Sequence, residues 1–214
     1  MEALQKSPLI QFGPASGLAP RSQAQELARL AAQLETRVPG SAGHARRVSL
    51  YAAGTAKRMG LSPAQVATVR RAGELHDIGK VETPAEIVNK PGPLSAEEYE
   101  VVRRHADLGG WIVAGLGDAE LAAIVRHHHE RLDGDGYPHG LAGAEIPLGA
   151  RIVAVADTFD AVASGRPYRP ARRAREALEL LDAEAGGQLD PEAVAAFRGY
   201  YSRFARLRRV ALRL

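Results

Sequence analysis

The spacing of apolar residues constrains the fold of this chain more than any other feature of its sequence. From Ser22 onward, apolar residues recur every three or four positions, beginning with Leu27, Leu30, Ala31 and Leu34, which is the period of an amphipathic helix. No segment alternates apolar and polar residues convincingly, as a half-buried strand would. The 39 alanines also favour helix, because alanine has the highest helix propensity. The sequence therefore predicts an all-α fold, a compact helical bundle.

Capping signals and turn residues divide this pattern into separate helices. A capping residue that accepts a backbone N–H marks a helix start, and we expect such starts at Ser22, Ser41, Ser62–Gln65, Ser95–Glu98 and Asp118. A further helix is predicted over Leu148–Ala163, followed by one that ends at Gly186-Gly187 and one that starts at Asp190-Pro191. Residues 130–149 contain five Gly and two Pro, which predicts a long functional loop.

Length and composition favour a single soluble domain. Hydrophobic residues make up 45% and charged residues 25% of the 214 positions, the balance of an ordinary globular protein. We expect residues 1–21 to be a flexible leader, too short for a sensor domain, and residues 22–214 to be the domain.

The sequence shows no pattern of a secretory signal and no apolar stretch long enough to span a membrane. It has no Cys for disulfides or thiolate chemistry. A cytoplasmic location is expected.

Positive charge is concentrated at the C-terminus. The net charge is +3, but residues 198–214 carry six Arg and no acidic residue, so the rest of the chain is at −3. This asymmetry indicates a local contact surface and argues against nucleic-acid binding. A basic amphipathic helix is expected over residues 191–214, with apolar positions at Tyr200, Phe204, Leu207, Ala211 and Leu214. We expect it to pack on its own domain; a homodimer contact or an anionic membrane surface is the alternative.

Imidazoles and carboxylates occur on several of the expected helices, often at their ends. They are His44, His76, Asp77, His105, His128, His129 and Asp157. Neutral imidazole and ionised carboxylate are ligands for Mn, Fe, Zn, Co or Ni. Seven donors are too many for one ion with an open position, but they suit two ions that share Asp77. Paired ions promote in-line attack on phosphorus, and Lys80, one turn past Asp77, could neutralise the developing charge.

These donors lie in blocks that follow one another from His44 to Arg169. The blocks are HARRV (44–48), LHDIGK (75–80), KPGPLS (90–95), His105 with Gly109, HHERLDGDGYP (128–138), Ile146-Pro147, ARIVAVAD (150–157) and RPYR (166–169). In order and spacing, residues 44–169 resemble the HD-GYP domain, a subgroup of the HD metal-dependent phosphohydrolases. The eleven-residue run that ends in Gly-Tyr-Pro is the most specific of them.

The resemblance implies a cyclic-di-GMP phosphodiesterase whose product is pGpG, GMP or both. It implies a helical bundle with a Gly-rich loop beside a buried binuclear metal site, where a metal-bound hydroxide attacks phosphorus. By position, His44, His76, Asp77 and Asp157 resemble the ligands of one metal, and His105, His128 and His129 those of the second, with Asp77 bridging. Fe or Mn is expected, with Zn, Co or Ni as alternatives.

Other positions also take roles from the resemblance. Asp77 and Lys80 are the expected catalytic residues, and Lys80, Arg166 and Arg169 resemble the family's phosphate-binding positions. Some relatives have a Glu four residues before the first ligand His, where it supports a third metal. This chain has Gly40 there, so two metals are expected.

Several alternatives stay open at the level of sequence. The substrate could be another cyclic dinucleotide, such as a mixed guanine–adenine one, or another phosphoester. The chain could instead be a non-catalytic adaptor that binds metal and nucleotide; the Gly136-Tyr137-Pro138 loop of the family is associated with GGDEF-type partners. Asp160 could orient a ligand imidazole or pair with an Arg. His127 is expected to be solvent-exposed, and neither it nor His139 is expected to bind a metal.

Overall fold

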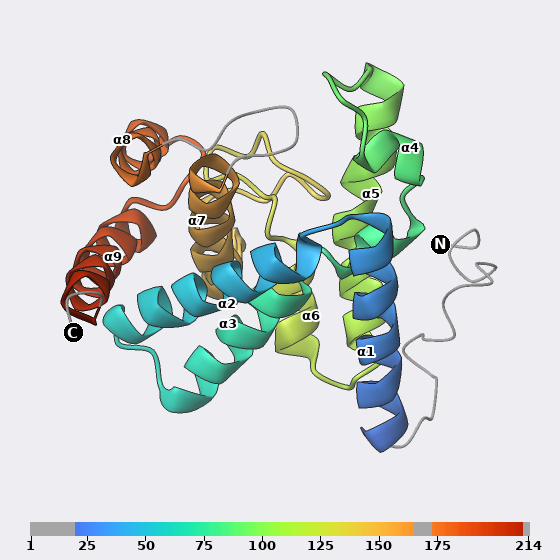
Figure 1. Ribbon diagram of the computed structural model, residues 1–214, viewed down its shortest axis with the longest axis horizontal. Coiled ribbons are helices and arrows are strands. Elements are labelled where there is room, and N and C mark those ends of the chain that lie inside the picture. The colour runs from blue at the N-terminus through green and yellow to red at the C-terminus, as the bar shows by residue number, and fades with distance from the viewer. Residues whose placement is uncertain (1–19, 165–172, 212–214) are drawn as a thin grey trace.

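Helices make up the regular structure of residues 20–164 and 173–211, the part of the chain that the computed structural model describes (Figure 1). In chain order they are α1 (Pro20–Arg37), α2 (Ser41–Arg58), α3 (Pro63–Leu75), the 3-10 turn η2 (Ile78–Glu82), α4 (Ala85–Val88), α5 (Ala96–Ala114), α6 (Ala119–Arg126), the 3-10 turn η3 (Gly143–Glu145), α7 (Leu148–Ala163), α8 (Ala174–Glu184) and α9 (Pro191–Ala211). These ranges contain no strand beyond one isolated bridge between Ala185 and Leu189. The predicted all-α fold is confirmed.

Three of the expected helix starts are built as predicted. Ser62 accepts a hydrogen bond from the Gln65 backbone N–H, and the Gln65 side chain accepts one from the Ser62 N–H. Ser95 and Glu98 form the same reciprocal pair at the start of α5. The Asp118 side chain accepts a hydrogen bond from the Leu121 backbone N–H at the start of α6. A cap of this kind stabilises a helix by about 1 kcal/mol.

The start of α2 differs from the prediction, because Ser41 is the first helical residue and not the cap. The preceding Gly40 has a φ of 90°, a conformation that glycine adopts without strain. Glu35 of α1 supplies the cap instead: its carboxylate accepts hydrogen bonds from Gly40 N (2.9 Å), Ala42 N (2.7 Å) and Ser41 Oγ (3.0 Å). This contact fixes α1 to the turn of α2 that carries His44.

The core lies where α2 and α7 cross and is extended by α9. The Tyr51 ring of α2 meets Phe159 of α7 and Phe197 of α9 edge-on, at centroid distances of 5.5 and 5.9 Å. Phe159 and Phe197 are fully buried. In Figure 1, α9 packs against the C-terminal end of α2, whereas α1 lies at the N-terminal end of α2. The described part of the C-terminal helix therefore packs on its own domain, and no helix in residues 20–164 or 173–211 is long and apolar enough to cross a membrane.

A glycine contact brings η2 directly against α5. A Cβ added at Gly79 would lie 2.1 Å from the His105 carbonyl oxygen and 2.7 Å from Gly109 N. Only glycine permits backbones to approach this closely. Because Gly79 follows Asp77 by two residues, this approach sets the distance between Asp77 and His105. The glycine is thus a structural requirement of the site.

We predict that Gly79→Ala destabilises the protein by about 2 kcal/mol or more, because the new methyl group must displace helix backbone. Gly43→Ala is the matched control: its Cβ would lie 3.4 Å from the flexible end of Arg47, and alanine favours a helix interior by up to about 1 kcal/mol over glycine. Urea unfolding of both variants measures the difference. Equal stability of the two variants would contradict the close-packing argument.

Candidate metal centre

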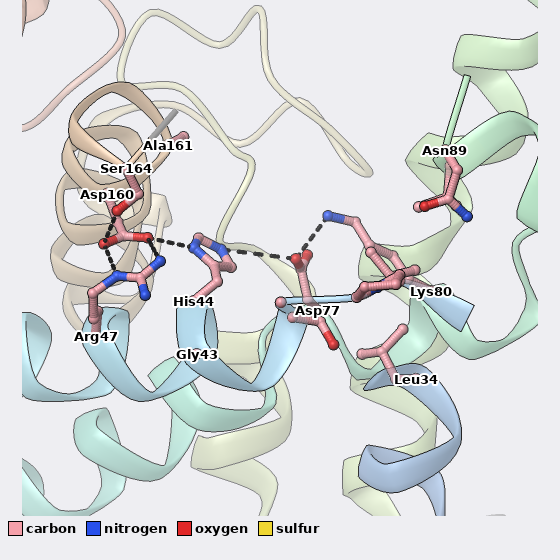
Figure 2. Close-up of a pocket in the computed structure, with 15 residues that line it drawn as sticks. Leu34, Gly43, His44, Arg47, Asp77, Lys80, Asn89, Asp160, Ala161 and Ser164 are labelled. Carbon is pink, nitrogen blue, oxygen red and sulfur yellow. Dashed lines mark hydrogen bonds and ion pairs between the residues drawn. The ribbon is translucent and has the colours of Figure 1, made fainter. Parts of the chain in front are cut away.

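A cavity of about 340 Å³ opens between α2, η2 and α7, and residues of α1 and α4 also line it (Figure 2). Its lining includes His44 and Arg47 on one side and Asp77, Lys80 and Asn89 on the other. Gly40 also lines the cavity, so no side chain enters it from the position four residues before His44. The cavity therefore combines imidazole, carboxylate and cationic groups around a solvent-accessible space.

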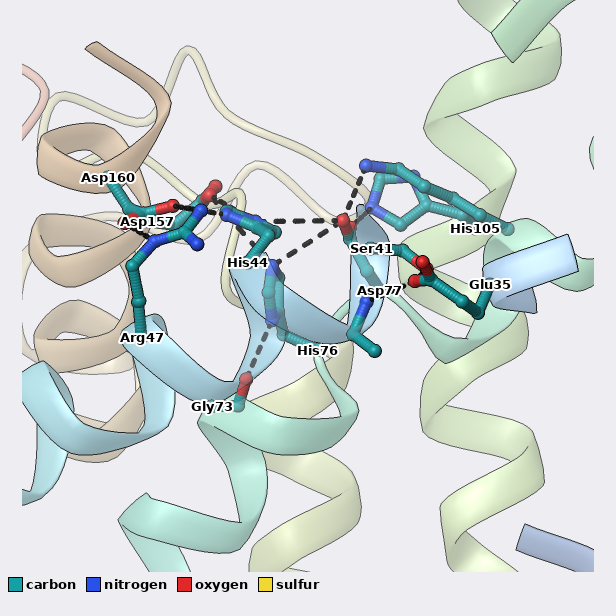
Figure 3. A network of polar contacts seen from close by, with 12 residues as sticks. Glu35, Ser41, His44, Arg47, Gly73, His76, Asp77, His105, Asp157 and Asp160 are labelled. Atoms are coloured by element: carbon teal, nitrogen blue, oxygen red, sulfur yellow. Dashed lines mark hydrogen bonds and ion pairs between the residues drawn. The ribbon is translucent and has the colours of Figure 1, made fainter. Parts of the chain in front are cut away.

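Two groups of side chains of metal-ligand type meet beside this cavity. Figure 3 shows four of them, His44, His76, Asp77 and His105. The donor atoms of each group lie within 4.8 Å of one another. The first, called the His44 group below, is His44, His76 and Asp77; the second, called the His105 group, is Asp77, His105, His128 and His129. Asp77 belongs to both, because Oδ2 lies 3.6 Å from His76 Nε2 while Oδ1 lies 3.5 Å from His105 Nε2.

Asp157 of α7 lies next to the His44 group. Its Oδ1 is 3.1 Å from His44 Nε2 and 3.8 Å from His76 Nε2. The structure thus brings together all seven residues that the sequence singled out, from α2, the ends of α3 and α6, the middle of α5, and α7. Their roles as ligands stay a prediction.

Three of the imidazoles are held by the same hydrogen bond. The Nδ1 atoms of His76, His105 and His128 each lie 2.5–3.0 Å from the backbone carbonyl oxygen three residues earlier. A carbonyl only accepts, so each Nδ1 must carry the proton and donate it. The Nε2 lone pair then faces the cluster, which is the tautomer that metal-binding histidines use.

The inward atoms of the cluster lack partners within the chain. Nε2 of His76, His105 and His128 and Oδ1 of Asp77 are buried and have no hydrogen-bond partner among the described residues. A buried polar atom without a partner costs about 1–3 kcal/mol. Four such atoms facing one another are explained by a cation that accepts their lone pairs. The residues present therefore fit divalent metal ions, as the sequence predicted in general terms.

The His105 group presents neutral imidazoles. Burial lowers the pKa of His105 to about 3 and that of His129 to about 4, and the charge of Lys80 acts in the same direction on both. Burial likewise holds the pKa of His128 well below its usual range. At neutral pH no proton competes with a metal for these lone pairs.

His44 has the opposite charge state in the absence of metal. Burial lowers its pKa, but hydrogen bonds to Asp157 and Asp160 outweigh burial and raise it to about 9. Asp160 Oδ2 lies 2.8 Å from His44 Nδ1, and both Asp160 oxygens accept from Arg47 at 2.7 and 2.9 Å. Asp160 therefore orients the His44 imidazole and pairs with an Arg, so both roles considered for it are realised.

Lys80 keeps Asp77 ionised. Burial raises the pKa of the Asp77 carboxyl, but Lys80 and the neighbouring imidazoles outweigh burial and hold it well below its usual range. The Lys80 Nζ donates to Asp77 Oδ2 at 2.7 Å and also lines the cavity. A cation in this position can contact an anionic ligand while it stabilises the shared carboxylate.

Comparison with known proteins identifies the family. The HD domain matches residues 29–193. This chain belongs to the HD domain family. The resemblance to the HD-GYP subgroup is confirmed by relatives that are named cyclic di-GMP phosphodiesterases.

The curated relatives are longer than this chain. It is 42% identical over 175 residues to the cyclic di-GMP phosphodiesterase response regulator RpfG of Xanthomonas campestris, covering 80% of this chain and 46% of that protein. It is 39% identical over 166 residues to the 3'3'-cGAMP-specific phosphodiesterase 3 of Vibrio cholerae. This match covers 77% of this chain and 36% of that protein. The chain thus spans less than half the length of these relatives.

Solved structures share the fold of this HD domain. A protein described as Bd1817, an HDG"Y"P protein from Bdellovibrio bacteriovorus, has a TM-score of 0.66 at 18% identity, over 94% of this chain and 67% of that one. The cyclic GMP-AMP phosphodiesterase V-cGAP3 of V. cholerae has a TM-score of 0.55 at 31% identity. This match covers 86% of this chain and 42% of that one.

The Gly-rich loop of the HD domain contacts the cluster through Tyr137. Its ring stacks on His129 at 4.8 Å between centroids, and its backbone N–H donates to the His129 carbonyl. The Arg103 guanidinium of α5 lies 4.8 Å from the centre of the same ring. Tyr137 thus covers a predicted ligand.

Glu130 holds the loop in shape. Its oxygens accept hydrogen bonds from the backbone N–H groups of His139 (2.8 Å) and Leu141 (3.1 Å). The prediction for His127 was wrong: the side chain is half-buried rather than exposed, because its Nδ1 donates to the Ala123 carbonyl of α6.

Some residues at the site were not predicted from the sequence, and two that were predicted lie outside the described residues. Arg47 was not predicted to contact the centre, although its place three residues after His44 puts both on one helical face. No sequence signal identified Arg103 or Asn89. The predicted phosphate-binding residues Arg166 and Arg169 lie outside the described residues.

We predict that Asp160→Asn lowers the affinity of the His44 group for Mn²⁺ about 10- to 100-fold, the usual cost of losing a group that orients a ligand histidine. Asparagine keeps the shape but weakens the contacts with His44 and Arg47. Asp107→Asn is the control, since Asp107 pairs with Arg126 on the surface. Metal titration followed by calorimetry measures both variants; unchanged affinity in Asp160→Asn would refute a positioning role.

Proposed function

We propose that this chain is a metal-dependent phosphodiesterase that hydrolyses cyclic-di-GMP. The observation that carries the proposal is the pair of donor groups that share Asp77 on the wall of an accessible cavity. Membership of the HD domain family and relatives named cyclic di-GMP phosphodiesterases support it.

Two divalent ions, Fe or Mn in preference to Zn, Co or Ni, are the proposed cofactors. His44, His76, Asp77 and Asp157 would hold one ion, and Asp77, His105, His128 and His129 the other. When bound, such ions supply Lewis acidity that acidifies water and polarises a phosphodiester. Gly40 offers no carboxylate for a third ion, so the proposed number is two.

The protein's own side chains bind and orient the substrate in this proposal. Lys80 Nζ, 2.7 Å from Asp77 Oδ2 and exposed to the cavity, contacts a phosphate oxygen next to the shared carboxylate. Arg166 and Arg169 bind the phosphates as planar, permanently charged forks. Asp160 holds His44 Nδ1, so that His44 Nε2 faces the cluster.

A 3'3'-cGAMP phosphodiesterase is the second candidate. It is favoured by a relative named 3'3'-cGAMP-specific phosphodiesterase 3, which is 39% identical to this chain over 166 residues. The two substrates differ only in one base, and the polar groups described above bind phosphate and metal rather than a base. The chemistry of the site is therefore the same for both candidates.

Interaction partners belong to the proposal as well. A GGDEF-type domain would contact the loop at Gly136-Tyr137-Pro138, and a homodimer is the second proposed assembly. A purely adaptor role is disfavoured by the complete donor set, since binding a partner requires no such cluster.

We predict that Asp77→Asn abolishes metal-dependent turnover, with a loss of at least about 100-fold, because neither ion keeps its shared carboxylate. Protein purified without oxygen and loaded with Fe²⁺ or Mn²⁺ would be assayed with cyclic-di-GMP, 3'3'-cGAMP and linear pGpG, with product identification and elemental analysis. We expect the wild-type protein to cleave cyclic-di-GMP faster than the other two substrates. Fully metallated wild-type protein that binds a dinucleotide without cleaving it would support the adaptor and overturn the enzymatic proposal.

We predict that Lys80→Ala keeps the bound metal but raises KM and lowers kcat/KM by about 100-fold, because a charge-assisted contact to phosphate is lost. Lys90→Ala is the matched control, since Lys90 pairs with Glu98 at the start of α5. Steady-state kinetics with elemental analysis distinguishes the two. If the two variants behaved alike, Lys80 would have no role in substrate binding.

A further inference from the structure

A second cluster of metal-ligand side chains lies at the C-terminal end of α6, outside the centre built on Asp77. It consists of His127, Glu130 and His139, whose donor atoms lie within 4.8 Å of one another. His127 follows the last residue of α6, Glu130 begins the Gly-rich loop, and His139 follows Pro138 in that loop. No residue of this cluster has a role in the proposed phosphodiesterase reaction.

The two imidazoles are arranged as ligands of one ion would be. His127 Nδ1 donates to the Ala123 carbonyl at 2.8 Å, so Nε2 carries the lone pair and points away from α6. That Nε2 lies 3.1 Å from His139 Nδ1. Two nitrogens that each bind a tetrahedral Zn²⁺ at about 2.0–2.1 Å are about 3.3 Å apart. The pair therefore needs almost no rearrangement to share an ion.

Glu130 adds a negative charge directly beside this pair. The residue is buried, with 4% of its surface exposed, and each of its oxygens accepts one backbone N–H from the loop. A carboxylate oxygen can accept more than one bond, so both keep capacity for a ligand. Among the residues that the structure describes, no Lys or Arg forms an ion pair with Glu130. A buried carboxylate without such a partner favours a cation nearby.

We propose that His127, Glu130 and His139 form a further binding site for a divalent ion of the zinc class. Two nitrogens and one oxygen suit Zn²⁺, with water in the fourth position. Mg²⁺ and Ca²⁺ prefer oxygen ligands alone, so they are not expected there. His139 is exposed, and its ring can turn to complete the coordination without disturbing the core.

An ion at this site would tie the loop to helix α6. It would link His127 to His139 across the segment that carries His128, His129 and Tyr137. Because Tyr137 stacks on His129, fixing the loop also fixes the cover over the His105 group. The site is thus placed to stabilise the metal centre from outside it.

Zinc binding to the 214-residue chain tests this proposal. Wild type, His139→Ala and Asp135→Ala would be equilibrated with Zn²⁺ by dialysis, and the bound metal measured by elemental analysis. We expect His139→Ala to bind about one Zn²⁺ fewer per chain than wild type. Asp135→Ala, exposed in the same loop but outside the cluster, is the control and should bind as wild type does.

Asp77→Asn separates this site from the proposed catalytic centre. We expect Asp77→Asn with His139→Ala to bind about one Zn²⁺ fewer than Asp77→Asn alone, and the Zn²⁺-dependent rise in melting temperature to be smaller. This difference does not depend on the protein being a phosphodiesterase. Equal zinc binding with and without His139 would overturn the proposal and leave only a hydrogen bond between two imidazoles.

Discussion

The site depends on burying one carboxylate among imidazoles from separate helices. Asp77 is 8% exposed, and its two oxygens face different histidine groups. An ionised carboxylate is costly to bury without compensation. Within the chain the largest compensation is Lys80, at 2.7 Å, and the neighbouring imidazoles add to it. The approach of Gly79 to α5 places this charge at a fixed distance from His105. The turn that contains Asp77, Gly79 and Lys80 therefore sets both the packing of η2 on α5 and the position of the buried negative charge.

Helical geometry sets the direction of the surrounding imidazoles. His76 and His128 lie just past the ends of α3 and α6, where backbone carbonyls lack intrahelical partners. Each ring donates Nδ1–H to a carbonyl three residues earlier, so the local helix turns Nε2 inward before any metal binds. His44 lies inside a helix and depends on Asp160 of α7 for the same orientation. The cluster is thus preorganised partly by local and partly by tertiary contacts.

The difference between local and tertiary contacts also explains which features could be predicted from the sequence. The caps at Ser62 and Ser95 and the bounds of α7 follow from residues a few positions apart, and they were predicted correctly. The cap of α2 by Glu35 and the contact of Arg103 with Tyr137 join separate elements, so no local pattern indicates them. The donor types suggested two ions that share Asp77, but the assignment of the seven donors to two sites came from family resemblance, because helical spacing alone does not place five helices around one point.

The two donor groups differ in chemistry although they share a residue. The His105 group contains three imidazoles whose lone pairs burial keeps free of protons. His44 instead lies between Asp157 and Asp160, which hold a proton on it in the metal-free protein. An ion that enters the His44 group must displace that proton, whereas an ion that enters the His105 group meets neutral ligands. Burial in the His105 group and carboxylate contacts in the His44 group thus give two adjoining positions different proton requirements for binding a metal.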